Sequence, residues 1–100
     1  MGDLKITGRM SVERLQREFK AAFGGSLRVY NGSIFADPKA TLASIRKGNA
    51  TGGEFTANGN MFCGRFEKEV LEKFGIKVQV ATKDNTALVA DNTSLSKLEK

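Results

Sequence analysis

Two stretches of the chain, ITGRMSVERLQREFKAAFGG (residues 6–25) and ANGNMFCGRFEKEVLEKFGI (residues 57–76), carry one pattern 51 positions apart. The same offset pairs residues 4–30 with residues 55–81 without a gap. Seven of these 27 pairs are identical: Gly8/Gly59, Met10/Met61, Arg14/Arg65, Glu18/Glu69, Phe23/Phe74, Gly24/Gly75 and Val29/Val80. The matched spacing of glycines and core-type residues predicts an internal duplication.

Each half begins with the pattern of a strand followed by a helix. Residues 4–10 and 55–61 alternate apolar and polar side chains, which is typical of a strand with one buried face. Apolar residues at helical spacing follow in both halves. They are Val12, Leu15, Phe19, Ala22 and Phe23 in the first half, and Phe62, Phe66, Val70, Leu71 and Phe74 in the second. Ser11 is suited to cap the first helix, and Gly24 and Gly75 are suited to end the two helices.

A second strand and a short helix complete each half. The segments SLRVY (26–30) and KVQVA (77–81) alternate again, and Asn31-Gly32 predicts a tight hairpin turn after the first of them. Asp37 followed by Pro38 predicts the start of a short helix that ends before Gly48. The C-terminal residues DNTSLSKLEK repeat this helix, with Leu42 matched to Leu95 and Ile45 to Leu98 after a two-residue insertion.

These elements predict a single α+β domain over residues 1–100, built from repeats at about 4–47 and 55–100 and joined by a Gly-rich connector at 48–53. We expect the two first strands to lie side by side and antiparallel in one mixed four-stranded sheet. Both main helices would then cover one face of that sheet, which is a ferredoxin-like arrangement. Gly8 and Gly59 would lie within its central strands, allowing close approach by another element.

An alternative arrangement comes from the segment FGGSLRVYNGSIFADPKATLASIRKG (residues 23–48). Its order of helix end, strand, tight turn, short strand and Asp resembles the middle of ubiquitin-like (β-grasp) proteins. The chain departs from that family in lacking a clear N-terminal hairpin and the diglycine tail used in conjugation, so the resemblance implies no modifier role. The same segment, with GNMFCGRFEKEVLEKFGIKVQVA (59–81), is similar to small uncharacterised bacterial proteins, which implies no activity.

Composition argues against several classes of function. The single cysteine, Cys63, and the absence of histidine favour neither a multi-cysteine nor a histidine metal site, so we expect no metal, no cofactor and no catalytic residues. Cys63 matches Val12 in the other half, which predicts a small buried core residue. The sequence has no apolar run long enough to span a membrane and no export signal, so we expect a cytoplasmic location without membrane contact.

The polar side of the predicted sheet is the candidate binding face. Its residues are Lys5, Arg9, Arg28, Tyr30, Asn58, Asn60, Lys77 and Gln79, with Thr7 and Thr56 between them. The preferred hypothesis is a small non-enzymatic module that binds a protein partner or forms a homodimer. The alternative is sequence-tolerant binding of single-stranded nucleic acid, since the net charge is +5 and Tyr30 can stack on a base.

The seven phenylalanines fall into two predicted groups. Phe19, Phe23, Phe66 and Phe74 lie on the helix stripes and are expected in the core. Phe35, near the hairpin, and Phe62, at the helix start, are expected to be partly exposed, where either could anchor a partner.

Overall fold

The computed structural model describes residues 3–31, 33–45 and 54–98. Their elements follow the order β1 (Leu4–Thr7), α1 (Val12–Phe23), β2 (Ser26–Asn31), β3 (Ile34–Phe35), α2 (Leu42–Ile45), β4 (Glu54–Ala57), α3 (Cys63–Phe74), β5 (Lys77–Ala81) and a 3-10 turn, η1 (Leu95–Lys97). The structure is therefore of the α+β class, as predicted. The proposed connector at 48–53 lies outside the described residues.

The main helices begin and end where local chemistry places them. The Ser11 side chain accepts a hydrogen bond from the Arg14 backbone N–H at 3.2 Å and so caps the start of α1. The helices end at Gly24 and Gly75, whose φ angles of 88° and 66° lie in the left-handed region that glycine adopts without strain. Four side chains of each helix are buried, in one stripe: Val12, Leu15, Phe19 and Phe23 in α1, and Cys63, Phe66, Val70 and Phe74 in α3.

The strands form two separate sheets, so the prediction of one four-stranded sheet is wrong. β1 pairs with β4 antiparallel, with Lys5 opposite Thr56, and the expected pairing of the two first strands is confirmed. The second strands do not flank that pair. Instead β2 pairs antiparallel with β5, and the short strand β3 lies on the other edge of β2. We call the two pairs the β1/β4 ribbon and the β2/β5 ribbon.

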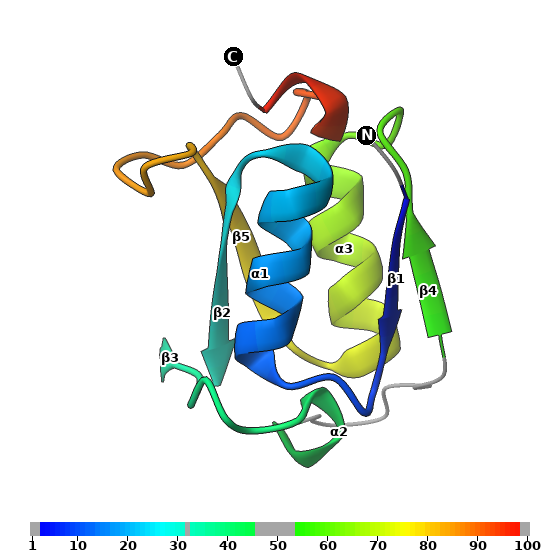
Figure 1. Cartoon of the computed structure of the whole chain (residues 1–100), viewed down its shortest axis with the longest axis vertical. Helices are drawn as coiled ribbons and strands as arrows, with labels where there is room; N and C mark the ends of the chain where they lie inside the picture. Colours follow the sequence, from blue (N-terminus) through cyan, green and yellow to red (C-terminus); the bar gives the residue numbers. More distant parts are fainter. Residues whose placement is uncertain (1–2, 32, 46–53, 99–100) are drawn as a thin grey trace.

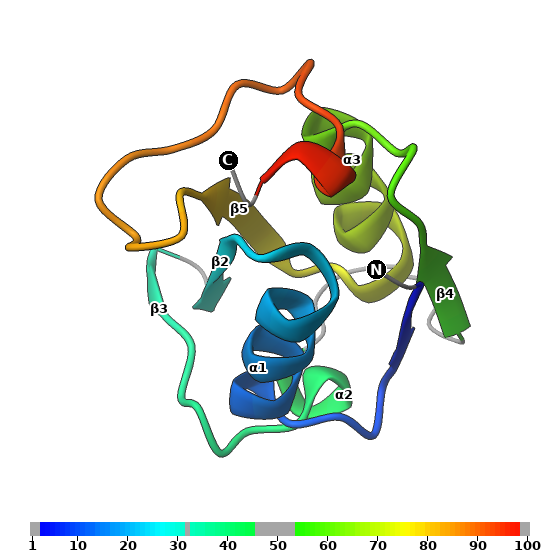
Figure 2. The ribbon, with the colours of Figure 1, turned by 45° about the horizontal axis from the view of Figure 1, so that its top comes forward.

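Both helices lie between the two ribbons, as Figures 1 and 2 show from two directions. The prediction that they cover one face of a common sheet is therefore also wrong. Each ribbon turns its apolar face inward: Leu4, Ile6, Phe55 and Ala57 from one, and Leu27, Val29, Val78 and Val80 from the other are all buried. Because each ribbon has only one apolar face, the helices between them bury both with a single core.

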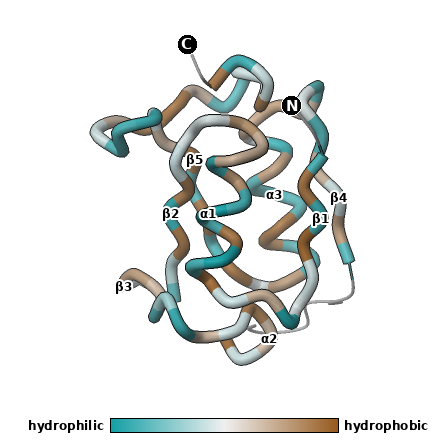
Figure 3. Tube along the Cα trace, viewed as in Figure 1, coloured by the Kyte–Doolittle hydropathy of each residue, from teal (hydrophilic) through white to brown (hydrophobic). Residues whose placement is uncertain are grey.

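Phenylalanine rings hold the centre of this core. Phe19 of α1 lies 5.3 Å from Phe66 of α3 between ring centroids, and Phe66 lies 6.2 Å from Phe55 of β4. The four helix-stripe phenylalanines are buried, as predicted, whereas Phe35 and Phe62 are 65% and 54% exposed. The hydropathy view in Figure 3 shows β3, which contains Phe35, as a hydrophobic piece at the margin of the molecule.

The first short helix starts later than Asp37 and Pro38 predict. Asp37 instead closes a turn, because its backbone oxygen and side chain accept from Ala40 N and Lys39 N. The next residues pair with the entry to α1, where Val12 N donates to Ala40 O at 2.8 Å. Helix α2 therefore begins only at Leu42, whose own N–H completes this pairing by donating to Met10 O at 2.9 Å.

Hydrogen bonds recur at matching places in the two halves. Val12 N donates to Ala40 O, and Cys63 N donates to Thr93 O; Leu42 N donates to Met10 O, and Leu95 N donates to Met61 O. All four distances are 2.8–2.9 Å. The same offsets of 51 and 53 that align the sequence therefore align these contacts.

The matched glycines Gly8 and Gly59 lie in turns just after β1 and β4, not within the strands as predicted. The expected close approach is present at Gly59, whereas the contact at Gly8 is an ordinary one. A Cβ at Gly8 would lie 3.4 Å from the Ala43 Cβ, and one at Gly59 would lie 3.0 Å from the Ser96 Cβ. Gly59 therefore lets η1 pack closely against its turn, and Gly8 leaves room for a small side chain beside α2.

Candidate functional site

The eight residues of the predicted binding face do not form one surface. Lys5 lies on the β1/β4 ribbon, and Arg9, Asn58 and Asn60 lie in the turns that follow its strands. The other four, Arg28, Tyr30, Lys77 and Gln79, lie together on the β2/β5 ribbon. Since the helices separate the two ribbons, the predicted face becomes two faces with different chemistry.

The outer face of the β1/β4 ribbon has its charges paired. Lys5 Nζ lies 3.3 Å from Glu54 Oε1, and both side chains are exposed. In the turn after β4, Asn58 Oδ1 accepts from the Asn60 backbone N–H at 3.0 Å. Sequence reasoning misses Glu54, because the alternating pattern that predicts this strand starts at Phe55. With Glu54 included, this ribbon presents little net charge.

The outer face of the β2/β5 ribbon carries an aromatic stack. The rings of Tyr30 and Phe35 lie 5.1 Å apart at 21°, and Lys77 Nζ lies 5.8 Å from the centre of the Tyr30 ring. The Tyr30 hydroxyl donates to Gln79 Oε1 at 2.7 Å. Arg28, opposite Gln79, donates to Asn85 Oδ1 at 2.7 Å. We call the set Arg28, Tyr30, Phe35, Lys77 and Gln79 the aromatic face.

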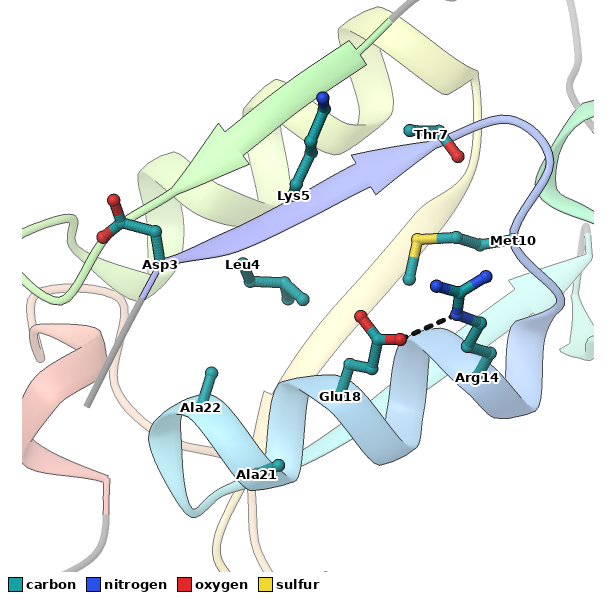
Figure 4. Close-up of a pocket in the computed structure, with 9 residues that line it drawn as sticks. All are labelled: Asp3, Leu4, Lys5, Thr7, Met10, Arg14, Glu18, Ala21 and Ala22. Atoms are coloured by element: carbon teal, nitrogen blue, oxygen red, sulfur yellow. Dashed lines mark hydrogen bonds and ion pairs between the residues drawn. The ribbon is translucent and has the colours of Figure 1, made fainter.

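A groove of about 720 Å³ runs between β1 and α1 (Figure 4). Successive residues of β1 line it, and because strand side chains alternate between faces, such a groove follows the edge of the strand. Among the described residues β1 pairs only with β4, so this edge has no strand partner. The groove has an apolar lining of Leu4, Met10, Ala21 and Ala22, and it includes Asp3 and Arg14.

The two small residues on α1 distinguish this groove from the matching place on α3. Ala21 and Ala22 correspond to Glu72 and Lys73, which are long and charged. Sequence reasoning placed Ala22 in the apolar stripe of the first helix and named neither alanine as a site residue, although the comparison of the two repeats shows the difference. Arg14 Nε and Glu18 Oε2, which form an ion pair at 2.7 Å, border the groove beside these alanines.

The edges of the β2/β5 ribbon are covered by side chains and short pairings. Gln16 Nε2 donates to Leu27 O at 2.9 Å, and Val80 N donates to Glu67 Oε2 at the same distance. Strand β3 covers the rest of β2, and Leu88 forms a bridge to Ala81 beside β5. Such covering blocks further strand pairing, whereas the edge of β1 has no equivalent side-chain hydrogen bond among the described residues.

Two buried or partly buried groups have shifted pKa values. Burial raises the pKa of the Cys63 thiol to about 11, with Glu67 and Asp91 adding to the shift. Burial likewise raises the pKa of the Glu67 carboxyl, against the hydrogen bond from Val80 N–H, which lowers it. Cys63 is fully buried and its thiol is protonated at neutral pH, so it is a core residue rather than a nucleophile.

Over residues 3–31, 33–45 and 54–98, no three His, Cys, Asp or Glu side chains lie together as metal ligands would. No helix in those residues has the length and apolar character to cross a membrane. Comparison with protein-family models, with curated proteins and with solved structures finds no match to this chain. The ubiquitin-like and bacterial resemblances therefore stay predictions.

Proposed function

We propose that the protein is a non-enzymatic binding module that adds an extended segment of a partner protein to the edge of β1. The observation that carries the proposal is the edge of β1 that no strand in the described part of the chain pairs, beside the groove that Ala21 and Ala22 leave open. Strand addition uses backbone hydrogen bonds for affinity and neighbouring pockets for specificity. The buried, protonated Cys63 supports a role other than nucleophilic catalysis.

The groove indicates the chemistry of the segment. Its lining at Leu4, Ala21 and Ala22 suits alternate small or medium apolar side chains. Asp3 lies at the end where β1 begins, and Arg14 lies near the end where β1 finishes (Figure 4). Because Glu18 pairs with Arg14 and Lys5 lines the groove with Asp3, the charged lining is balanced and suits a segment without a large net charge.

We also propose that the chain arose by duplication of one strand–helix–strand unit. The recurring hydrogen bonds at Val12 and Cys63 and the paired glycine caps support this. The conserved pattern then describes the scaffold, and function lies where the copies differ. Ala21-Ala22 against Glu72-Lys73 is such a difference: Ala21 and Glu72 are exposed, and Ala22 and Lys73 are partly buried.

The test places the two side chains of the second repeat, Glu72 and Lys73, at the matching positions of the first. Linear seven-residue peptides are selected on the unaltered protein from a random library, and their affinities are measured by fluorescence anisotropy. The variant Ala21→Glu/Ala22→Lys copies α3 and should weaken binding at least about tenfold by filling the groove. Its matched control, Glu72→Ala/Lys73→Ala, should bind as the unaltered protein does.

Backbone amide exchange identifies the mode of binding. A bound peptide should slow exchange at residues of β1 and leave β5 unchanged, since only β1 gains new hydrogen bonds. Equal affinity for the grafted variant, or protection elsewhere alone, overturns the proposal. Light scattering tests whether a second copy of the chain fills the groove instead. If the protein is a dimer and the Ala21→Glu/Ala22→Lys variant is a monomer, the groove binds a second copy and the partner-segment proposal is overturned.

A further inference from the structure

We propose that the aromatic face binds single-stranded nucleic acid, with a base stacked on Phe35 and phosphates held by Lys77 and Arg28. This face lies on the β2/β5 ribbon, and the groove lies beside β1 across the helices (Figures 1 and 2). The inference therefore concerns a second site and does not depend on the proposed function.

The order of the strands leaves one aromatic ring surface open. Tyr30 lies between its two cross-strand neighbours, Phe35 on β3 and Lys77 on β5. Phe35 stacks on the Tyr30 ring, and Lys77 Nζ approaches that ring from the β5 side. The Tyr30 ring is therefore in contact with both neighbours. Phe35 ends the row and is 65% exposed. A planar base placed on Phe35 extends an existing stack without rearranging it.

The charged side chains that β2 and β5 present on this face are cationic, and the Glu67 carboxyl of α3 lines a groove beside Lys77 and Gln79. The outward positions of the β2 and β5 ladder hold two cations and no carboxylate: Ser26, Arg28, Tyr30, Lys77 and Gln79. On the other ribbon, by contrast, Lys5 is paired with Glu54 at 3.3 Å. A carboxylate beyond this face, that of Asp84, accepts hydrogen bonds from the Thr82 and Thr86 hydroxyls at 2.8 Å. The aromatic face therefore favours an anionic ligand.

The polar groups of this face are also oriented. Asn85 holds the Arg28 guanidinium through two hydrogen bonds, one to its side chain and one to its backbone oxygen. The Gln79 side-chain oxygen accepts from Tyr30, which leaves its amide nitrogen as a donor toward a ligand. The open ring of Phe35, the oriented Arg28 and the free amide of Gln79 together match the way proteins hold unstacked bases. The two cations distinguish this face from an apolar surface for protein contact.

The experiment measures fluorescence anisotropy of labelled oligothymidylate and oligouridylate of about 15 nucleotides. Phe35→Ala should weaken binding about tenfold through lost stacking. Lys77→Glu and Arg28→Glu should each weaken binding and make it less dependent on salt between about 50 and 200 mM. Tyr30 is the only tyrosine and the chain has no tryptophan, so quenching of its emission reports contact at this face.

Matched controls separate this site from general attraction to a basic protein. Phe62→Ala removes another exposed ring, and Lys5→Glu makes the same charge change on the other ribbon; both should leave affinity nearly unchanged. Circular dichroism confirms that each variant is folded. Equal losses for Lys5→Glu and Lys77→Glu, or no binding at low salt, overturn the proposal. The proposal is also overturned if Phe35→Ala keeps its affinity for the oligonucleotides but no longer binds a selected peptide. That result would assign the face to protein contact.

The groove variant keeps the two proposals distinguishable. Ala21→Glu/Ala22→Lys should bind oligonucleotides as the unaltered protein does, because α1 separates its groove from the aromatic face. If the grafted variant loses oligonucleotide binding while Phe35→Ala retains it, the nucleic acid occupies the groove and the assignment to the aromatic face is overturned.

Discussion

Arg28 lies directly opposite Gln79 in the ladder between β2 and β5, and these two residues are 51 positions apart. Lys5 and Thr56, opposite one another in the ladder between β1 and β4, have the same separation. Residues that correspond in the two halves thus meet at the centre of both ribbons. An axis of rotation that exchanged the two halves would have to pass through both pairs, across the two ribbons and the helices between them.

The two helix ends should respond alike to loss of glycine. Gly24→Ala and Gly75→Ala each force a side chain into a left-handed conformation and should each cost about 1–2 kcal/mol of unfolding free energy, measured by urea denaturation. Gly8→Ala is the control, because its new Cβ meets Ala43 at an ordinary 3.4 Å, and it should change stability by less than about 0.5 kcal/mol. A large cost at only one helix end would contradict the equivalence of the two ends.

Two phenylalanines four positions apart should differ sharply. Phe66 is fully buried against Phe19 and Phe55, so Phe66→Ala should cost about 3–5 kcal/mol and leave a protein that is largely unfolded on mild heating. Phe62 is 54% exposed, and Phe62→Ala should change stability by less than about 1 kcal/mol. Thermal unfolding followed by circular dichroism compares them, and similar melting temperatures would refute the proposed core.

Glu67→Gln should stabilise the protein near neutral pH. Its matched residue is already Gln16, and a glutamine oxygen still accepts from Val80 N–H without carrying a charge into a partly buried position. Because the folded pKa of Glu67 lies above its ordinary 4.5, the folded state holds this proton more tightly than the unfolded state. Wild-type stability therefore falls as pH rises above about 4.5, through the folded pKa.

Urea denaturation at a series of pH values tests this difference. The advantage of Glu67→Gln over the wild type should grow across that pH window and then stay constant. An advantage that shrinks as pH rises would show that the hydrogen bond outweighs burial at this carboxyl.

Cys63 should react slowly while the protein is folded. Its pKa of about 11, compared with an ordinary 9.0, lowers the thiolate fraction near pH 8 about 100-fold, and burial blocks access further. Reaction with a thiol reagent such as DTNB should therefore be at least about 100-fold slower than in urea. Rates that match in the two conditions would show an accessible thiol. Stability should also fall as pH rises from 9 toward 11, and Cys63→Val, which copies Val12, should remove that fall.

The sequence predicts the elements of this fold better than their order in space. Alternation at Leu4 and Ile6 identifies which side of a strand is buried, and helical spacing at Leu15 and Phe19 does the same for a helix. Neither pattern identifies the neighbouring strand. One four-stranded sheet and two ribbons bury the same side chains, so the pairing of β2 with β5 could not be chosen from periodicity.

The errors in the candidate site follow from that choice. Lys5 and Arg28 share a face only if their strands share a sheet, and the two ribbons put them on different surfaces. Glu54, which pairs with Lys5, precedes the residue at which alternation was recognised. The start of α2 was missed because Asp37-Pro38 is a local signal, whereas the pairing of Ala40 with Val12 depends on residues far apart in the chain.

The division of both ribbons between the two halves has a consequence for synthesis on the ribosome. Every pair in the two main ladders joins residues between 47 and 55 positions apart, whereas the β2–β3 hairpin and the Ala81–Leu88 bridge are local. Neither ribbon can form until the second half of the chain has emerged. The nascent first half must carry the apolar sides of β1, α1 and β2 uncovered for that interval, when molecular chaperones have their longest opportunity to bind it.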